Sequence, residues 1–238
     1  MSHRARTRHW YIAVVPAVLF ALAASSFRYV DVYRPNAPTE RIAGAVGESL
    51  HIEQTATVEG ADNLIAADVT LTSAQLVRRE DVPEMSTGAD IDIIAVNFDW
   101  AASPDIPLRT CDLRLISEAG KRYLPSPRLS SALVNPPAVL HSVSHCVPED
   151  APGPLMAMGI ELGTSEYDGP PRPETWSTTV YFVVPGGTQP SAVEMIWQTP
   201  VYLEFTGVSL DSAPVSLPAD ARSSLSSAGA MNTTAATK

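Results

Sequence analysis

The chain has few of the residues that mark the commonest functional classes. It contains 2 cysteines among 238 residues, too few for a disulfide-rich miniature scaffold. Its 16 Lys and Arg are outnumbered by 26 Asp and Glu, giving a formal net charge of −10. This balance argues against nucleic acid as a partner, because phosphates require clustered basic side chains. Its 13 Gly are outnumbered by 21 Pro, which disfavours long helices and favours strands joined by loops.

Motifs of the common enzyme classes are also absent. There is no G-x-S-x-G nucleophile elbow, no H-E-x-x-H zinc motif and no phosphate-binding loop. The sequence therefore predicts a protein that is not an enzyme, with no catalytic residue, no cofactor and no metal site.

Three weaker arrangements stay open as alternatives to that prediction. The first is a zinc site, because two histidines four positions apart would share a helical face next to Cys146. The second is a calcium site on acidic residues around one expected strand, although these lack the spacing of a calcium loop. The third is a hydrolase triad built from Ser142, His145 and a remote aspartate. The zinc alternative uses His141 and His145, with Glu149 and Asp150 close behind. The calcium alternative uses Asp90, Asp92, Asp99 and Asp105.

The most informative segment that is present is apolar. Trp10 to Phe27 form 18 residues without a charge, and Arg4, Arg6 and Arg8 precede them. A basic start followed by such a run is typical of an export signal or a membrane anchor. We predict a cytoplasmic N-terminus over residues 1–9 and a transmembrane anchor or signal peptide over 10–28. The body is then extracytoplasmic, either on a single-pass anchor or secreted after cleavage at the small residues of the run.

The exported location determines how the cysteines are interpreted. Cys111 and Cys146 lie 35 positions apart, and an oxidising compartment permits them to pair. We predict a disulfide between them, with free thiols or metal ligation as alternatives.

The body shows the alternation of half-buried strands. In the clearest example, Ile94, Val96, Phe98 and Trp100 face one way. Further strands are expected at 51–58, 68–77, 110–116, 122–124, 155–162, 176–184, 193–197 and 201–205. We predict an all-β antiparallel sandwich over residues 48–210, with aromatic side chains in its core.

The remaining segments are expected to be irregular. Residues 29–47 resemble a linker that leaves the membrane. Residues 125–154 contain seven prolines and form an insertion too long for a plain connector. Residues 211–238 are rich in Ser, Ala and Thr and are expected to be a disordered polar tail.

The order of elements resembles a known family. Ala95-Val96-Asn97-Phe98 ends one strand, a strand and Gly turn lead to Tyr123, and a later strand runs into Val184-Pro185. This pattern is similar to the telokin-like immunoglobulin-fold domains of unknown function in bacterial cell-envelope proteins. The resemblance implies an immunoglobulin-like sandwich in an extracellular setting and supplies no catalytic residues.

These observations lead to one functional prediction and two alternatives. The prediction is a membrane-anchored extracytoplasmic domain with a non-catalytic binding or structural role, whose partner is an envelope protein or wall component. The first alternative is a carrier or sensor of a small apolar ligand held between the sheets under the 125–154 loop. The second is a secreted hydrolase that uses His141 or His145.

Overall fold

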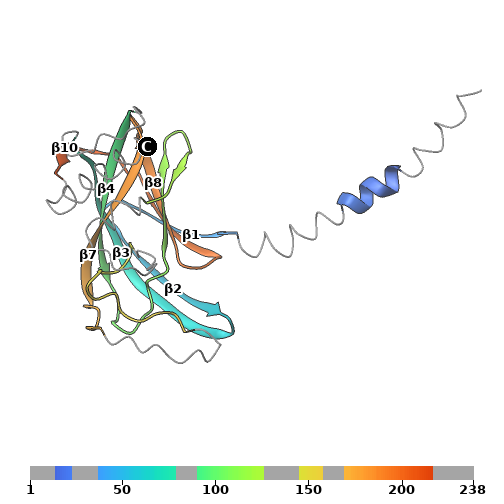
Figure 1. Cartoon of the computed structure of the whole chain (residues 1–238), viewed down its shortest axis with the longest axis horizontal. Coiled ribbons are helices and arrows are strands. Elements are labelled where there is room, and N and C mark those ends of the chain that lie inside the picture. The colour runs from blue at the N-terminus through green and yellow to red at the C-terminus, as the bar shows by residue number, and fades with distance from the viewer. Residues whose placement is uncertain (1–13, 23–36, 79–89, 126–144, 158–168, 217–238) are drawn as a thin grey trace, which may run out of the picture.

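The protein is described by a computed structural model over residues 14–22, 37–78, 90–125, 145–157 and 169–216. In this part of the chain, ten strands form two facing sheets (Figure 1). The first, called the β8 sheet, has the order β1-β9-β8-β5-β6. The second, called the β4 sheet, has the order β10-β3-β4-β7, with β2 also paired to β3. The predicted all-β sandwich is therefore confirmed.

The strand boundaries follow the alternating segments of the sequence. The β8 sheet contains β1 (Glu40–Ala45), β5 (Asp112–Ser117), β6 (Arg122–Tyr123), β8 (Pro190–Ile196) and β9 (Val201–Thr206). The β4 sheet contains β2 (Ser49–Val58), β3 (Ala61–Val77), β4 (Ile91–Ala101), β7 (Thr175–Pro185) and β10 (Asp211–Val215). All pairs are antiparallel except two parallel ones, β1 with β9 and β10 with β3.

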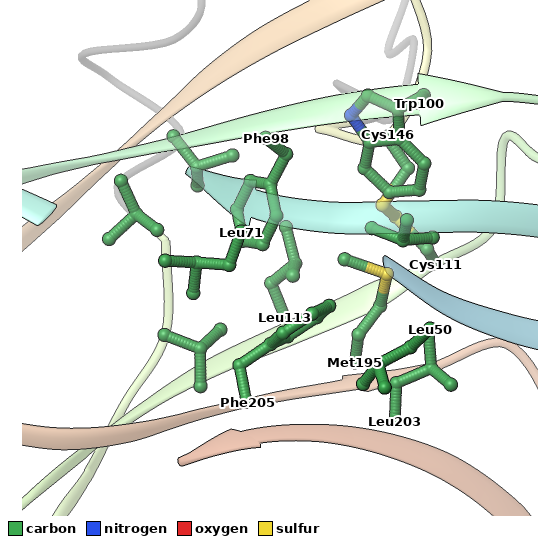
Figure 2. Packing of buried hydrophobic residues seen from close by; sticks show 14 of the residues in the cluster. Leu50, Leu71, Phe98, Trp100, Cys111, Leu113, Cys146, Met195, Leu203 and Phe205 are labelled. Carbon is green, nitrogen blue, oxygen red and sulfur yellow. A yellow bond between two sulfur atoms is a disulfide. The ribbon is translucent and has the colours of Figure 1, made fainter. Parts of the chain in front are cut away.

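The core lies between the sheets, where the predicted inward rows meet. Figure 2 shows Phe98 and Trp100 of β4 facing Met195 and Phe205 of the opposite sheet. The rings of Phe98 and Phe205 lie 6.1 Å apart and at a steep angle, and both side chains are fully buried. Burying an aromatic or large aliphatic side chain stabilises the fold by roughly 1.5–3 kcal/mol. The expected aromatic core is confirmed.

Strand β1 lies inside the segment predicted to be a linker, so that prediction is wrong over Glu40–Ala45. The strand pairs in register with β9, from Glu40 opposite Val201 to Ala45 opposite Thr206. Gly44 permits this arrangement, because a side chain there would collide with Leu50 of β2. The segment appears irregular in sequence because its partner lies about 160 residues away, which local patterns do not reveal.

Strand β10 similarly occupies the first residues of the predicted disordered tail. Asp211 lies opposite Gln75 and Val215 opposite Val77, and the Arg78 N–H donates to the Val215 carbonyl at 2.8 Å. The rest of the tail, 217–238, lies outside the described residues. The expected strand at 155–162 is not formed over residues 155–157, and its remainder is also outside the described part.

The apolar leader is only partly described. Residues 14–22 are helical. Within the described ranges, no helix has both the length and the apolar character needed to cross a membrane. The other residues of the predicted span 10–28 lie outside those ranges.

Candidate functional site

The candidate site is the end of the sandwich that is covered by residues 145–157, called here the strap. A disulfide joins Cys146 of the strap to Cys111, which immediately precedes β5, with a Cα–Cα distance of 6.2 Å. Cys146 is fully buried and Cys111 nearly so, and both belong to the core beside Trp100 (Figure 2). The predicted disulfide is confirmed, and it fixes the described end of the Pro-rich insertion to the β8 sheet.

Three tryptophans fill the space under the strap. The rings of Trp100 and Trp176, neighbours on β4 and β7, stack with centroids 5.8 Å apart and planes 3° from parallel. Trp197 meets Trp100 edge-on at 6.2 Å. The indole N–H of Trp176 donates to the Cys146 carbonyl at 3.1 Å, and that of Trp197 donates to the Leu108 carbonyl at 3.2 Å. The strap is thus held to the aromatic core by the Trp176 hydrogen bond as well as by the disulfide.

Arg172 is a buried cation at the same end. Its guanidinium donates to the carbonyls of Ser103 at 2.6 Å and Ile106 at 2.8 Å, and lies over the Trp176 ring at 4.8 Å. Only 1% of the residue is exposed. Desolvation lowers the pKa of Arg172 to about 10, against the opposing attraction of Asp105, so the group stays charged at neutral pH. Its contacts hold the loop between β4 and β5 against the segment that leads into β7.

Sequence reasoning missed Arg172. The residue lies between prolines in Pro170-Pro171-Arg172-Pro173, four positions before a core tryptophan. No motif rule covers this arrangement. The available signal was a basic residue in a rigid segment next to an inward-facing aromatic, where cation–π contact is favourable.

The far end of the strap is held by Asn63 of β3. The Asn63 side-chain amide donates to the Ala157 carbonyl at 3.0 Å, and the Ala157 N–H donates to the Asn63 side-chain oxygen at 2.6 Å. The side chain therefore pairs with the strap backbone as a neighbouring strand would. The strap is fixed at Cys146 by a covalent bond and at Ala157 by this pair of hydrogen bonds.

Of the residues His141, Ser142 and His145 that the zinc and hydrolase alternatives use, His145 is the one that the structure describes. His145 is half-buried at the start of the strap, and desolvation lowers its pKa. His141 and Ser142 lie outside the described residues. Burial and the nearby charge of Asp150 raise the pKa of Glu149. Across the described ranges, no three His, Cys, Asp or Glu side chains gather as a metal-binding group.

The four aspartates considered for calcium have separate positions. Asp92 accepts a hydrogen bond from the Gly187 N–H at 2.7 Å, and the Asp90 carbonyl accepts one from the Gly186 N–H at 2.9 Å, so both belong to the turn after β7. Asp99 accepts from the Ser177 hydroxyl at 2.6 Å on the outer face of the β4 sheet. Asp105 lies in the loop next to Arg172. The structure brings Asp90 and Asp92 to one turn and does not bring all four together.

The strap displays one large exposed apolar side chain. Leu155 is 52% exposed between the fixed points at Cys146 and Ala157, and neighbouring Met156 packs towards the core. An apolar side chain displayed on a constrained segment loses little conformational entropy when it is buried by a partner.

The comparisons with known proteins give one structural similarity. The chain is similar to the crystal structure of MPT63, a secreted protein from Mycobacterium tuberculosis, at 12% sequence identity and a TM-score of 0.37. The aligned region covers 71% of this chain and 98% of that one. No protein-family model and no curated protein sequence matches the chain.

Proposed function

We propose that this chain is an extracytoplasmic domain with a non-catalytic binding or bracing role in the cell envelope. In this proposal residues 10–28 hold it to the membrane, and the strap is its contact surface. The finer fold assignment, a telokin-like immunoglobulin domain, belongs to the same proposal and rests on the sequence resemblance. The acidic body fits a partner other than nucleic acid, such as an envelope protein or a wall component.

The Cys111–Cys146 disulfide is the observation that supports this function most directly. Structural disulfides persist in oxidising compartments and are rare in the cytosol. Here the bond fixes the segment that carries the exposed Leu155. Loops positioned by a rigid scaffold are common binding elements. A basic leader, an oxidised cysteine pair and a displayed loop together favour an exported binding domain.

The location is tested by reporter fusions to the C-terminus of the full chain. We expect an alkaline phosphatase fusion to be active and a green fluorescent protein fusion to be dark. Carbonate extraction then separates an anchored chain, which stays with the membrane, from a cleaved and secreted one. A fluorescent fusion with inactive phosphatase would contradict the proposal.

The contact role is tested by site-specific photo-cross-linking in cells. A photoreactive residue at Leu155 should capture an envelope component in a defined adduct. Leu124, which is 69% exposed at the end of β6, provides the matched control and should give no such adduct. Equal adducts at the two positions, or none at Leu155, would count against the strap as the contact surface.

The two alternatives lack a comparable observation. The carrier alternative expects apolar space beneath the strap, and the indole rings of Trp100, Trp176 and Trp197 occupy that position, each 9% exposed or less. The hydrolase alternative depends on His141, which lies outside the described residues, or on His145, whose lowered pKa follows from burial alone.

A further inference from the structure

A row of charged residues crosses the outer face of the β8 sheet, away from the strap. Glu194 of β8 lies directly opposite Glu204 of β9 on one side and Arg114 of β5 on the other. The row is extended at its ends by Arg41 of β1 and Arg122 of β6, which contact Glu204 and Glu194 respectively. These five side chains are called the charged row.

The centre of the charged row contains a carboxylate that is not fully satisfied. Glu194 is 6% exposed. Its Oε1 accepts a hydrogen bond from Arg122 at a long 3.3 Å, while its Oε2 is buried and has no hydrogen-bond partner in the described chain. A buried carboxylate oxygen without a donor is destabilising, so this atom has unused capacity for an N–H or O–H group.

The arginines of the charged row differ in how fully they are engaged. Arg41 holds Glu204 with two contacts of 2.8 Å. Arg122 makes the single long contact to Glu194, and its side chain is 61% exposed. Arg114 is half-buried and makes no side-chain hydrogen bond or ion pair within the described ranges. Two of the three arginines therefore have N–H donors available for an anion.

An occupant of this face must satisfy both kinds of group. It must present acceptors with negative charge to Arg114 and Arg122, and a donor to Glu194 Oε2. A phosphate or carboxylate without neighbouring hydroxyl groups supplies acceptors alone, whereas an acidic sugar carries hydroxyl donors next to its anionic group. Tyr202, half-buried on the same face of β9 opposite Arg41, adds an aromatic side chain of the kind that packs against sugars.

We propose that the charged row binds a glycan that carries carboxylate or phosphate groups. The anionic group accepts hydrogen bonds from Arg114 and Arg122, and a hydroxyl donates to Glu194 Oε2 after the exposed Arg122 side chain moves aside. The proposal relies on the extracytoplasmic location proposed above, where such polymers occur, and does not depend on the strap. It assigns to this chain a wall polymer as ligand, at a surface that the sequence did not single out.

The test measures binding of oligogalacturonate to the full chain reconstituted in uncharged lipid vesicles by isothermal titration calorimetry, with neutral dextran oligosaccharides and anionic lipid vesicles as competing ligands. We expect the wild type to bind oligogalacturonate and not dextran, with weaker binding at higher salt. Arg114→Gln should weaken binding about tenfold, in keeping with the loss of a charge-assisted hydrogen bond. Arg122→Gln should have a similar effect.

Lys121→Gln is the matched control, because it removes the same charge from an exposed residue at the β5–β6 turn. Arg114→Gln is expected to fold, since Arg114 makes no side-chain hydrogen bond or ion pair with the described residues, and circular dichroism checks this. If Arg114→Gln and Lys121→Gln weakened oligogalacturonate binding equally, the loss would be explained by net charge alone, and the proposal would be overturned. Preference for vesicles, or no oligogalacturonate binding, would also overturn it. Strap adducts at Leu155 that persist under these outcomes would leave the proposed function standing without this ligand.

Discussion

Two buried charges in this sandwich have different surroundings. Arg172 at the strap end is 1% exposed, with two backbone carbonyls as acceptors, the Trp176 ring against its guanidinium, and its Nε without an acceptor among the described residues. Glu194 on the outer face of the β8 sheet is 6% exposed, with one long contact and one carboxylate oxygen without a donor. The first group is held by main-chain carbonyls of one loop. The second is held by the side chain of an exposed arginine.

The difference indicates which charge is structural and which is available. A cation held by main-chain carbonyls fixes the loop that contains them, and exchanging these contacts for a ligand would disrupt the strap end. A carboxylate beside an exposed arginine can exchange its contact at small cost, because the arginine is already close to water. Burial alone therefore does not identify a binding group. The mobility of the partner atoms distinguishes the two cases.

The largest expected effect comes from removing the covalent support of the strap end. Replacing Cys111 and Cys146 together by Ser should lower the free energy of unfolding by about 3–4 kcal/mol, because the bond closes a loop of 35 residues in the unfolded chain. Denaturant unfolding of the full chain, followed by tryptophan fluorescence, measures the loss. Wild type unfolded in reductant is the control and should match the variant. A change below about 1 kcal/mol would show that hydrogen bonds alone hold the strap.

Arg172 gives the next effect. Arg172→Met keeps much of the side-chain volume but leaves the carbonyls of Ser103 and Ile106 without their donor. We expect a loss of about 2–6 kcal/mol, from about 1–3 kcal/mol for each carbonyl left without a donor. The same unfolding measurement applies, with Arg109→Met as a nearby change of the same type. A loss under about 1 kcal/mol would mean that water replaces the guanidinium at the two carbonyls, and that water therefore reaches the strap end.

Removing the charge of Glu194 should change the free energy of unfolding much less than removing that of Arg172. Glu194→Gln removes the charge at the centre of the charged row, but its partner Arg122 is 61% exposed and stays hydrated. The free energy of unfolding should change by less than about 1 kcal/mol in either direction, because no buried charge is left unpaired. A loss as large as that of Arg172→Met would show that Glu194 is structural and would remove the contrast between the two sites.

The sequence predicted the parts of this molecule that local pattern determines. Period-2 alternation identified the inward row of β4, because each residue of a strand must point to one face or the other. The disulfide followed from the exported location and from there being only two cysteines.

Strands β1 and β10 were missed because both depend on parallel partners far along the chain, Val201–Thr206 and Gln75–Val77. The charged row was missed for the same reason, since its five residues come from five different strands. Contacts set by sheet order are not encoded in any short window of sequence.

The smallest expected effect concerns two histidines with opposite pH responses, one of them at the strap end. His51 of β2 is exposed and lies 2.8 Å from Asp68, and that hydrogen bond raises its pKa, with a smaller contribution from Glu53. Stabilisation from a raised pKa is fully present below the unfolded-state value of about 6.5 and is lost as pH rises through the folded-state pKa. His51→Gln should therefore be less stable than wild type in acid, by about 0.2–1 kcal/mol as for exposed pairs, and equal to it in base.

His145 should show the reverse dependence, because desolvation lowers its pKa. Its neutral form is favoured in the folded state, so wild type loses stability as pH falls below about 6.5 and the unfolded chain takes up the proton first. His145→Gln removes this loss, so its stability relative to wild type should increase as pH falls. In base the two proteins should differ only by the change in packing, which does not depend on pH. Unfolding curves of the two variants across this range provide the measurement. The free energy of unfolding relative to wild type should fall in acid for His51→Gln and rise for His145→Gln. If it changed in the same direction for both variants, His145 would be as open to solvent as His51, and the strap end would not be shielded from water.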